Sequence, residues 1–259
     1  MSTTSSDTVE KPSMSPRRVL EALSGLLLGM FVSMLASTVV STSLPVIIHD
    51  LDGNQTAFTW VVTATLLTTA ISTPIWGKLA DLTNRKVLFQ LAIVIFVLAT
   101  AAAGFSTNPE MLIAFRAVQG IGAGGLAALS QVLMADIISP RERGRYMGLF
   151  GAVMAVATIG GPLLGGVITD AWGWRWNFFV ALPFAVLALI LVQATLHVPA
   201  RPKKKTSIDY LGIVLLSAAV SLLLIWVTNA GTATAGDWSD LANNDWWSLN
   251  TVLMLGGAI

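Results

Sequence analysis

Residues Val87–Ser106 have the sequence VLFQLAIVIFVLATAAAGFS, an unbroken run without a charged side chain. A helix of about 20 mostly apolar residues is what crosses roughly 30 Å of hydrocarbon. The other stretches of this kind are Val19–Leu44, Phe58–Gly77, Met111–Ala135, Tyr146–Thr169, Asn177–Leu196 and Tyr210–Val227, and one more opens near Ser248. These seven complete spans predict an all-α fold, a polytopic membrane helix bundle.

The composition agrees with a surface that faces lipid. The chain is 54% hydrophobic and 11% charged, whereas a soluble domain has about 25% charged residues. Its net charge of +1 gives no field that would attract nucleic acid. Cysteine is absent, which excludes a disulfide framework and thiolate metal sites. The two histidines have no partner at metal-ligand spacing, so we expect neither a metal nor a cofactor.

The distribution of basic residues predicts the orientation, because cytoplasmic loops of membrane proteins are enriched in Lys and Arg. With the N-terminus inside, the cytoplasmic segments contain most of the 15 basic residues. These are Lys11, Arg17, Arg18, Lys78, Arg85, Lys86, Arg141, Arg143, Arg145, Arg201, Lys203, Lys204 and Lys205. Tryptophans gather at the opposite boundary, as in an aromatic belt: Trp60, Trp172, Trp174, Trp176, Trp238, Trp246 and Trp247. We therefore expect a multi-pass protein of a bacterial cytoplasmic membrane with a cytoplasmic N-terminus.

The same pattern predicts the domain organisation. We expect a disordered cytoplasmic tail at 1–17, a six-helix unit at 18–200 and a basic cytoplasmic loop at 201–208. Residues 209–259 would contain a seventh helix, an outer loop and the start of an eighth helix. A chain that ended within an apolar helix would leave carbonyl groups unsatisfied in lipid, so we expect these residues to be part of a longer protein.

The segment Gly77–Lys86 (GKLADLTNRK) joins the second and third spans. It resembles motif A of the major facilitator superfamily, with Asn84 where glycine is usual. Asparagine tolerates a left-handed backbone, so we expect the tight turn to persist. Asp81 is spaced to pair with Arg85 and with Lys78 at the helix end. A short positive-inside loop is the alternative explanation. The resemblance implies a cytoplasmic gate formed by Gly77, Asp81, Arg85 and Lys86, with Asp81 as a latch to the other half of the protein.

The fourth span contains Arg116–Gly125 (RAVQGIGAGG). An arginine within a span usually faces the bundle interior or a water-filled cavity, although Arg116 could also extend to the outer interface. The segment resembles motif B of the same superfamily, which implies that Arg116, Gln119 and Gly120 take part in coupling protonation to transport. The spacing of Gly120, Gly122 and Gly125 is not a dinucleotide site, because no strand precedes it. We expect these glycines to permit close helix packing.

The fifth span resembles motif C, the antiporter signature, through Gly148, Gly161, Pro162, Gly165 and Gly166, with Ala157 where glycine is usual. Proline kinks a helix, and the glycines let a neighbouring helix approach. A generic kinked packing helix fits the same residues. The resemblance implies an exporter rather than an uptake symporter.

Ser37–Pro45 (STVVSTSLP) resembles a further motif of the fourteen-helix drug:proton antiporters, with Ala36 where aspartate is usual. The chain is thus similar to the N-terminal portion of that family: a six-helix half with the major facilitator fold and the start of the linker helices. This implies proton-coupled efflux of drug-like or amphipathic molecules by alternating access. The partners would be the substrate, protons, the lipid bilayer and a C-terminal half that transport requires.

Several alternatives stay open. The protein could export an endogenous metabolite or siderophore, or the chain could be a non-transporting fragment. An enzyme is disfavoured, because no His or acid pair is expected at membrane depth. No carboxylate is expected at mid-membrane, so the proton site lies either in the other half or around Arg116. Polar residues that could line a cavity are Ser33, Thr63, Thr65, Thr68, Gln119 and Gln131.

Overall fold

The structure is a computed structural model that describes residues 16–196 and 210–229, and within these ranges it is helical with no strand. The helices are α1 Pro16–Asp50, α2 Gln55–Leu82, α3 Arg85–Gly104, α4 Pro109–Ile137, α5 Arg143–Trp172, α6 Trp176–Phe179, α7 Ala181–Thr195 and α8 Tyr210–Asn229. The all-α prediction is confirmed. Helices α1, α2, α4 and α5 extend past the predicted spans at both ends, since a helix continues until a capping residue ends it; α3 begins two residues before its predicted span and ends at Gly104, two residues before the predicted Ser106.

Six described segments are long and apolar enough to cross a membrane. The short α6 and α7 together form the sixth span, Trp176–Thr195. Within α8, the predicted seventh helix, the described apolar stretch is the shorter Leu215–Ile225, so α8 is not one of these six segments. The basic loop, the eighth stretch from Ser248 and nearly all of the predicted tail lie outside the described residues.

Asparagine side chains define the start of three helices. Oδ1 of Asn54 accepts a hydrogen bond from the backbone N–H of Ala57 at 2.9 Å, and Asn84 and Asn108 cap α3 and α4 in the same way. The predicted tight turn persists, since only Thr83 and Asn84 separate α2 from α3, but Asn84 is not left-handed: its φ of −73° and ψ of 112° are extended. An N-cap residue adopts this conformation so that its side chain can reach the first free N–H groups of the helix.

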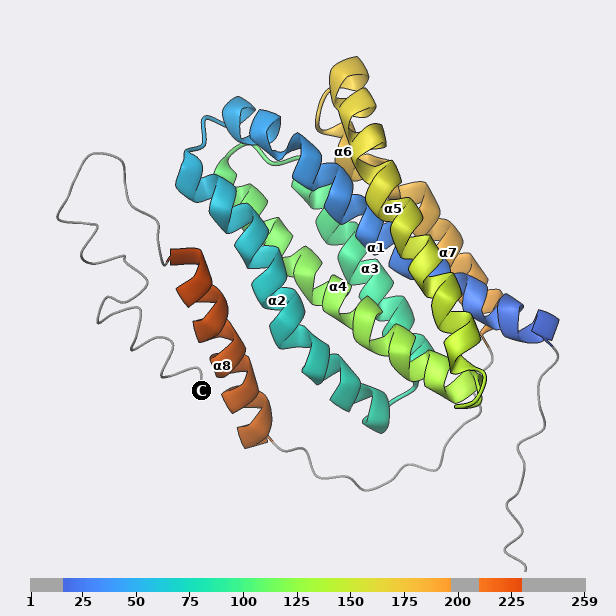
Figure 1. The fold of residues 1–259 in the computed structure, drawn as a ribbon. Helices are drawn as coiled ribbons and strands as arrows, with labels where there is room; N and C mark the ends of the chain where they lie inside the picture. The colour runs from blue at the N-terminus through green and yellow to red at the C-terminus, as the bar shows by residue number, and fades with distance from the viewer. Residues whose placement is uncertain (1–15, 197–209, 230–259) are drawn as a thin grey trace, which may run out of the picture.

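The helices form two neighbouring groups (Figure 1). Helix α4 packs between α2 and α3, and α1 packs against α5 and α7. The glycines of α4 make the first group possible: a Cβ at Gly122 would lie 2.6 Å from the backbone nitrogen of Phe96 on α3. At Gly125 it would lie 2.7 Å from Ala92 and 2.8 Å from the Trp76 ring. The prediction that these glycines permit close packing is confirmed.

An apolar core joins the two groups. Leu23, Phe89, Leu126 and Ala185 come from α1, α3, α4 and α7 and are almost fully buried in one cluster. A second cluster at the other end contains Ile47, Leu112 and Phe178. The exposed side chains of α5 are mostly apolar, like the buried ones. This is expected of a helix whose outer face meets lipid or further protein rather than water.

Candidate functional site

A cavity of about 190 Å³ lies between the two groups of helices. Its lining comes from five helices: Met30, Ser33, Met34 and Ser37 of α1; Thr65, Leu66 and Thr69 of α2; Phe96 of α3; Arg116, Gln119, Ala123, Leu126 and Ala127 of α4; and Met154 of α5. Three of the polar residues expected from the sequence, Ser33, Thr65 and Gln119, line it. The other three, Thr63, Thr68 and Gln131, are not among its lining residues.

Arg116 lies within the bundle and does not extend to the interface, since it is only 3% exposed. Its Nη1 donates a hydrogen bond of 2.6 Å to Oε1 of Gln119. Nε2 of Gln119 donates to Oγ1 of Thr100 at 2.8 Å, and that hydroxyl donates to the carbonyl oxygen of Phe96 at 2.6 Å. This chain of hydrogen bonds fixes the guanidinium against α3. Sequence reasoning missed Thr100, because nothing in the local pattern marks one threonine of α3 as the partner of a residue on α4.

Hydroxyl groups of α2 fix the backbone of α4 around Arg116. Thr65 donates to the carbonyl oxygen of Arg116 at 3.2 Å, and Thr69 donates to that of Gly120 at 3.1 Å. A Cβ at Gly120 would lie 2.5 Å from the carbonyl oxygen of Thr65. Gly120 therefore allows α2 and α4 to approach closely, and it has no group that could exchange a proton.

Within the described part of the chain, no carboxylate lines the cavity or forms a salt bridge with Arg116. Nε of Arg116 is buried without a hydrogen-bond partner. Ala36, the position where the similar family has aspartate, is fully buried in the apolar core. The cavity thus contains one cation and no compensating anion among the described residues. Nor do any three His, Asp or Glu side chains there come together to hold a metal ion.

Of the residues expected to form the gate, Arg85 and Asp81 take part in a set of ion pairs at one end of the bundle. Arg85 forms a salt bridge with Asp136, a second with Asp81 at 3.3 Å, and a hydrogen bond from Nε to the Ala80 carbonyl oxygen at 2.9 Å. The expected Asp81–Arg85 pair is confirmed, whereas Lys78 forms no salt bridge with any described residue.

The other two residues of the expected gate lie apart from these ion pairs. Nζ of Lys86 donates a hydrogen bond to a backbone carbonyl oxygen of α7. No described atom lies within 4 Å of the position that a Cβ would occupy at Gly77.

Sequence reasoning missed the role of Asp136. It lies in the last turn of α4, where a negative charge is unfavourable beside the free carbonyl groups unless a cation compensates it. Its side chain is 8% exposed and meets that of Arg85, which is 13% exposed. An acidic residue in the last turn of an apolar helix could have indicated, from the sequence alone, that a basic side chain of another element pairs with it.

The antiporter residues of α5 divide into two sets. Gly161 and Gly165 face α1, and a Cβ at Gly165 would lie 2.9 Å from the Val39 carbonyl oxygen. At Gly148 and Gly166, no described atom lies within 4 Å of the position that a Cβ would occupy, and Pro162 is exposed. The helix runs through Pro162 as one element. Only the first set has the packing role expected for the whole motif.

A polar network at the other end of the bundle was not expected. Oδ2 of Asp50 accepts hydrogen bonds from Nε1 of Trp174 at 2.7 Å and from Nη1 of Arg175 at 3.4 Å. Arg175 also donates to the Ser106 carbonyl oxygen at 3.3 Å. Trp174 is 4% exposed because its ring packs in the second apolar cluster, whereas Trp172 and Trp176 at the same end are exposed.

The chain matches a family model described as Major Facilitator Superfamily over residues 26–259. It is 38% identical to the Acurin A biosynthesis cluster MFS-type transporter of Aspergillus aculeatus, over 78% of this chain and 37% of that protein. It is 35% identical to the multidrug transporter protein MdtP of Bacillus subtilis, over 83% of this chain and 39% of that protein. The chain thus spans about two-fifths of the length of these curated relatives.

The fold is shared with solved transporters. The human organic anion transporter MFSD10 aligns with a TM-score of 0.66 at 19% identity, over 88% of this chain and 60% of that one. At this level of identity the likeness concerns the arrangement of the helices alone.

Proposed function

The chain belongs to the major facilitator superfamily, and from this premise we propose that it is the N-terminal portion of a proton-coupled exporter of drug-like or amphipathic small molecules. The observation that supports this most is the cavity between the helix groups. It combines one buried cation, Arg116, with methionine, leucine and phenylalanine side chains. Sites for small molecules typically have such apolar walls and few polar groups.

Transport in this proposal proceeds by alternating access. Proteins of this fold bind substrate near the bilayer midplane between two halves that rock against one another. The described six-span unit would supply one wall of that site, and the rest of the full-length protein would supply the other. Proton coupling requires a group whose loading favours one state over the other. We assign Arg116, Gln119 and Gly120 to the region where this coupling takes place.

The gate and the antiporter helix complete the proposal. Asp81 is 54% exposed on its side chain, so its carboxylate is accessible to the second half while Arg85 remains paired with Asp136. Gly148, Pro162 and Gly166, the second set of motif residues on α5, have small side chains or none. We propose that this face meets the second half, with the N-terminus and the basic loops in the cytoplasm.

A second candidate is the export of an endogenous acidic metabolite. The feature that favours it is the absence of a carboxylate from the described lining of the cavity. An exporter of cationic drugs would be expected to place an acid there, because a buried cation needs a compensating charge.

The test is dye efflux from a bacterium that lacks its own pumps and expresses the full-length protein. Cells are loaded with ethidium, a cation, or with fluorescein, an anion, and efflux is followed with and without a protonophore. We expect efflux of at least one dye, and we expect the protonophore to abolish it. Efflux that persists without the proton gradient would exclude proton coupling. No efflux of either dye from a correctly inserted protein would exclude the drug exporter and favour the metabolite exporter.

A further inference from the structure

The charge of Arg116 is not neutralised within the described residues. The side chain is 3% exposed, lines the cavity, and forms no salt bridge there. A charge in a low-dielectric environment is costly unless an opposite charge or hydrogen bonds compensate it. Gln119 accepts one hydrogen bond from Nη1, and Nε has no partner. A guanidinium has five N–H donors, so this one retains the capacity to bind an anion.

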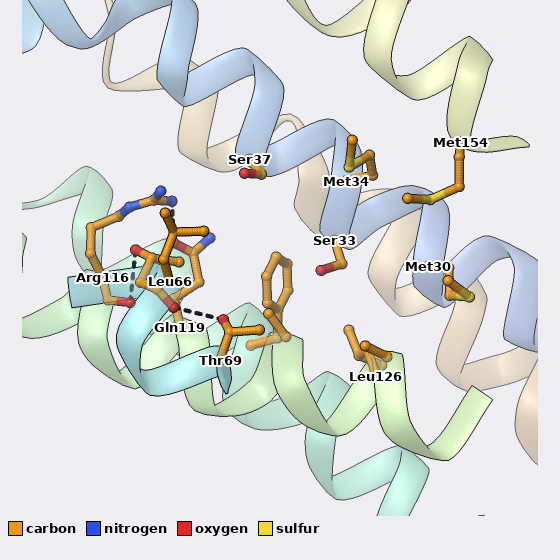
Figure 2. Close-up of a pocket in the computed structure, with 14 residues that line it drawn as sticks. Met30, Ser33, Met34, Ser37, Leu66, Thr69, Arg116, Gln119, Leu126 and Met154 are labelled. Atoms are coloured by element: carbon orange, nitrogen blue, oxygen red, sulfur yellow. Dashed lines mark hydrogen bonds between the residues drawn. The ribbon is translucent and has the colours of Figure 1, made fainter. Parts of the chain in front are cut away.

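The cavity is polar at one end and apolar at the other. Figure 2 shows Arg116 and Gln119 together at one end, and Met30 and Met154 at the other. Leu126 and Phe96 add to the apolar lining. Methionine side chains are flexible and polarisable, so they adapt to apolar ligands of different shapes. A ligand that satisfies both ends must contain a hydrogen-bond-accepting head and an apolar body.

We propose that this cavity binds amphipathic organic anions, with a carboxylate, sulfonate or phenolate oxygen of the ligand paired to the guanidinium of Arg116. The apolar part of the ligand lies along the methionine-lined wall. This assignment rests on the proposed function and specifies its substrate class. A cationic ligand of the same shape would bring a second positive charge to the same end, where no described carboxylate compensates it.

Gln119 acts in this site as a positioning residue. It holds Nη1 through Oε1 and is itself held by Thr100, which donates onward to the backbone of α3. The guanidinium therefore has a fixed orientation before the ligand arrives. A fixed donor set loses little conformational entropy on binding, so selectivity for an anion does not depend on rearrangement of the helices.

The test is equilibrium binding to the purified full-length protein in lipid nanodiscs, without a proton gradient. The probes are fluorescein, at a pH at which it is fully ionised, and the methyl ester of rhodamine, a cation with the same xanthene ring. Fluorescence anisotropy gives both dissociation constants. We expect fluorescein to bind at least about tenfold more tightly, because one charge pair in a desolvated site contributes that much. Equal affinity, or tighter binding of the cation, would overturn the proposal.

Variants locate the effect. Arg116→Met is expected to weaken fluorescein binding by about tenfold or more and to leave the rhodamine ester unchanged or more tightly bound. Arg116→Lys, which retains the charge and loses the planar fork, is expected to preserve the preference for the anion at lower affinity. Arg145→Gln removes an exposed positive charge outside the cavity, so it should change neither constant. An anion preference that survives in Arg116→Met, or disappears in Arg145→Gln, would contradict the assignment.

The binding experiment can be interpreted even if a variant does not fold or the protein does not export the dyes. If Arg116→Met does not fold, the preference of the unmodified protein and the behaviour of Arg116→Lys still decide the question. Anion binding in nanodiscs without dye efflux from cells would leave this site intact and reject the exporter. Proton-dependent efflux with no preference for the anion would keep the exporter and reject the site.

Discussion

Arg85 connects three parts of the chain through a single guanidinium. It pairs with Asp136 at the end of α4 and with Asp81 at the end of α2, and it donates to the carbonyl oxygen of Ala80. The two carboxylates differ in environment, because Asp136 is 8% exposed on its side chain and Asp81 is 54% exposed. The inner pair therefore fixes the structure, and the outer carboxylate remains available to another partner.

Removing one member of the inner pair should destabilise the protein strongly. We expect Arg85→Ala or Asp136→Ala to lower the free energy of unfolding by about 1.5–3 kcal/mol, because each removes a charged hydrogen-bond partner from a largely buried pair. The double variant should lose less than the sum of the two. The measurement is a double-mutant cycle on denaturant unfolding of the full-length protein in detergent.

The control for this cycle is Asp81→Asn, which removes the exposed partner. It should cost only about 0–1 kcal/mol, as exposed ion pairs do. Strictly additive losses from Arg85→Ala and Asp136→Ala would show that the two side chains do not interact in the folded protein.

At the scale of elements, α1 and α5 approach closely because glycines occupy their contact. Gly165 lies against the backbone of Val39, and Ser43 donates a hydrogen bond of 3.4 Å to the Gly165 carbonyl oxygen. Close backbone approach through small residues is how helices associate in membranes, where apolar burial alone gives no preference for protein over lipid. Part of the motif on α5 thus forms the contact between α5 and α1.

We expect Gly165→Ala to destabilise the protein by about 1–3 kcal/mol, because the added methyl group would overlap the backbone of Val39 and force the helices apart. Gly160→Ala on the same helix is the matched control, since no described atom lies within 4 Å of its Cβ position. The control should leave stability unchanged or raise it slightly through helix propensity. Thermal unfolding of both variants in detergent provides the comparison, and equal melting temperatures would contradict the packing role.

At the scale of the whole molecule, the two ends of the bundle differ in composition. The α2–α3 and α4–α5 connections, rich in basic residues, lie at one end, and the α1–α2 and α3–α4 connections lie at the other (Figure 1). The exposed tryptophans Trp172 and Trp176 lie at the second end. This separation is what the positive-inside rule requires of a multi-pass protein.

The orientation can be tested by cysteine labelling, since the 259 residues of the chain include no cysteine that would react in the background. Thr107→Cys and Ser139→Cys place exposed thiols at opposite ends of the bundle. In intact cells, a membrane-impermeant maleimide should label Thr107→Cys at once and Ser139→Cys only after permeabilisation. Labelling in the reverse order would invert the topology, and labelling of both in intact cells would exclude a sealed multi-pass arrangement.

Local sequence determined the helices of this protein. Runs of apolar residues predict membrane-spanning helices, because within the hydrocarbon layer a backbone must form all of its hydrogen bonds internally. The asparagines just before α2, α3 and α4 cap the first turns of these helices and so fix where they begin. The residues that resemble family motifs were also visible, since each motif lies within one segment. The helical positions of Arg116 and Gln119, three residues apart, predicted that their side chains would share a face.

Only the tertiary structure decided which helices meet and which residues face the cavity. The pairing of Arg85 with Asp136 and the contact of Gln119 with Thr100 join separate helices, and the hydrogen bond from Trp174 to Asp50 joins the α5–α6 connection to the end of α1. Such contacts depend on the rotation and separation of packed helices, and apolar periodicity does not specify these when most faces are apolar. The unpaired charge of Arg116 was likewise visible only once the surrounding helices were in place, because a charge is compensated or uncompensated by its neighbours in space rather than in sequence.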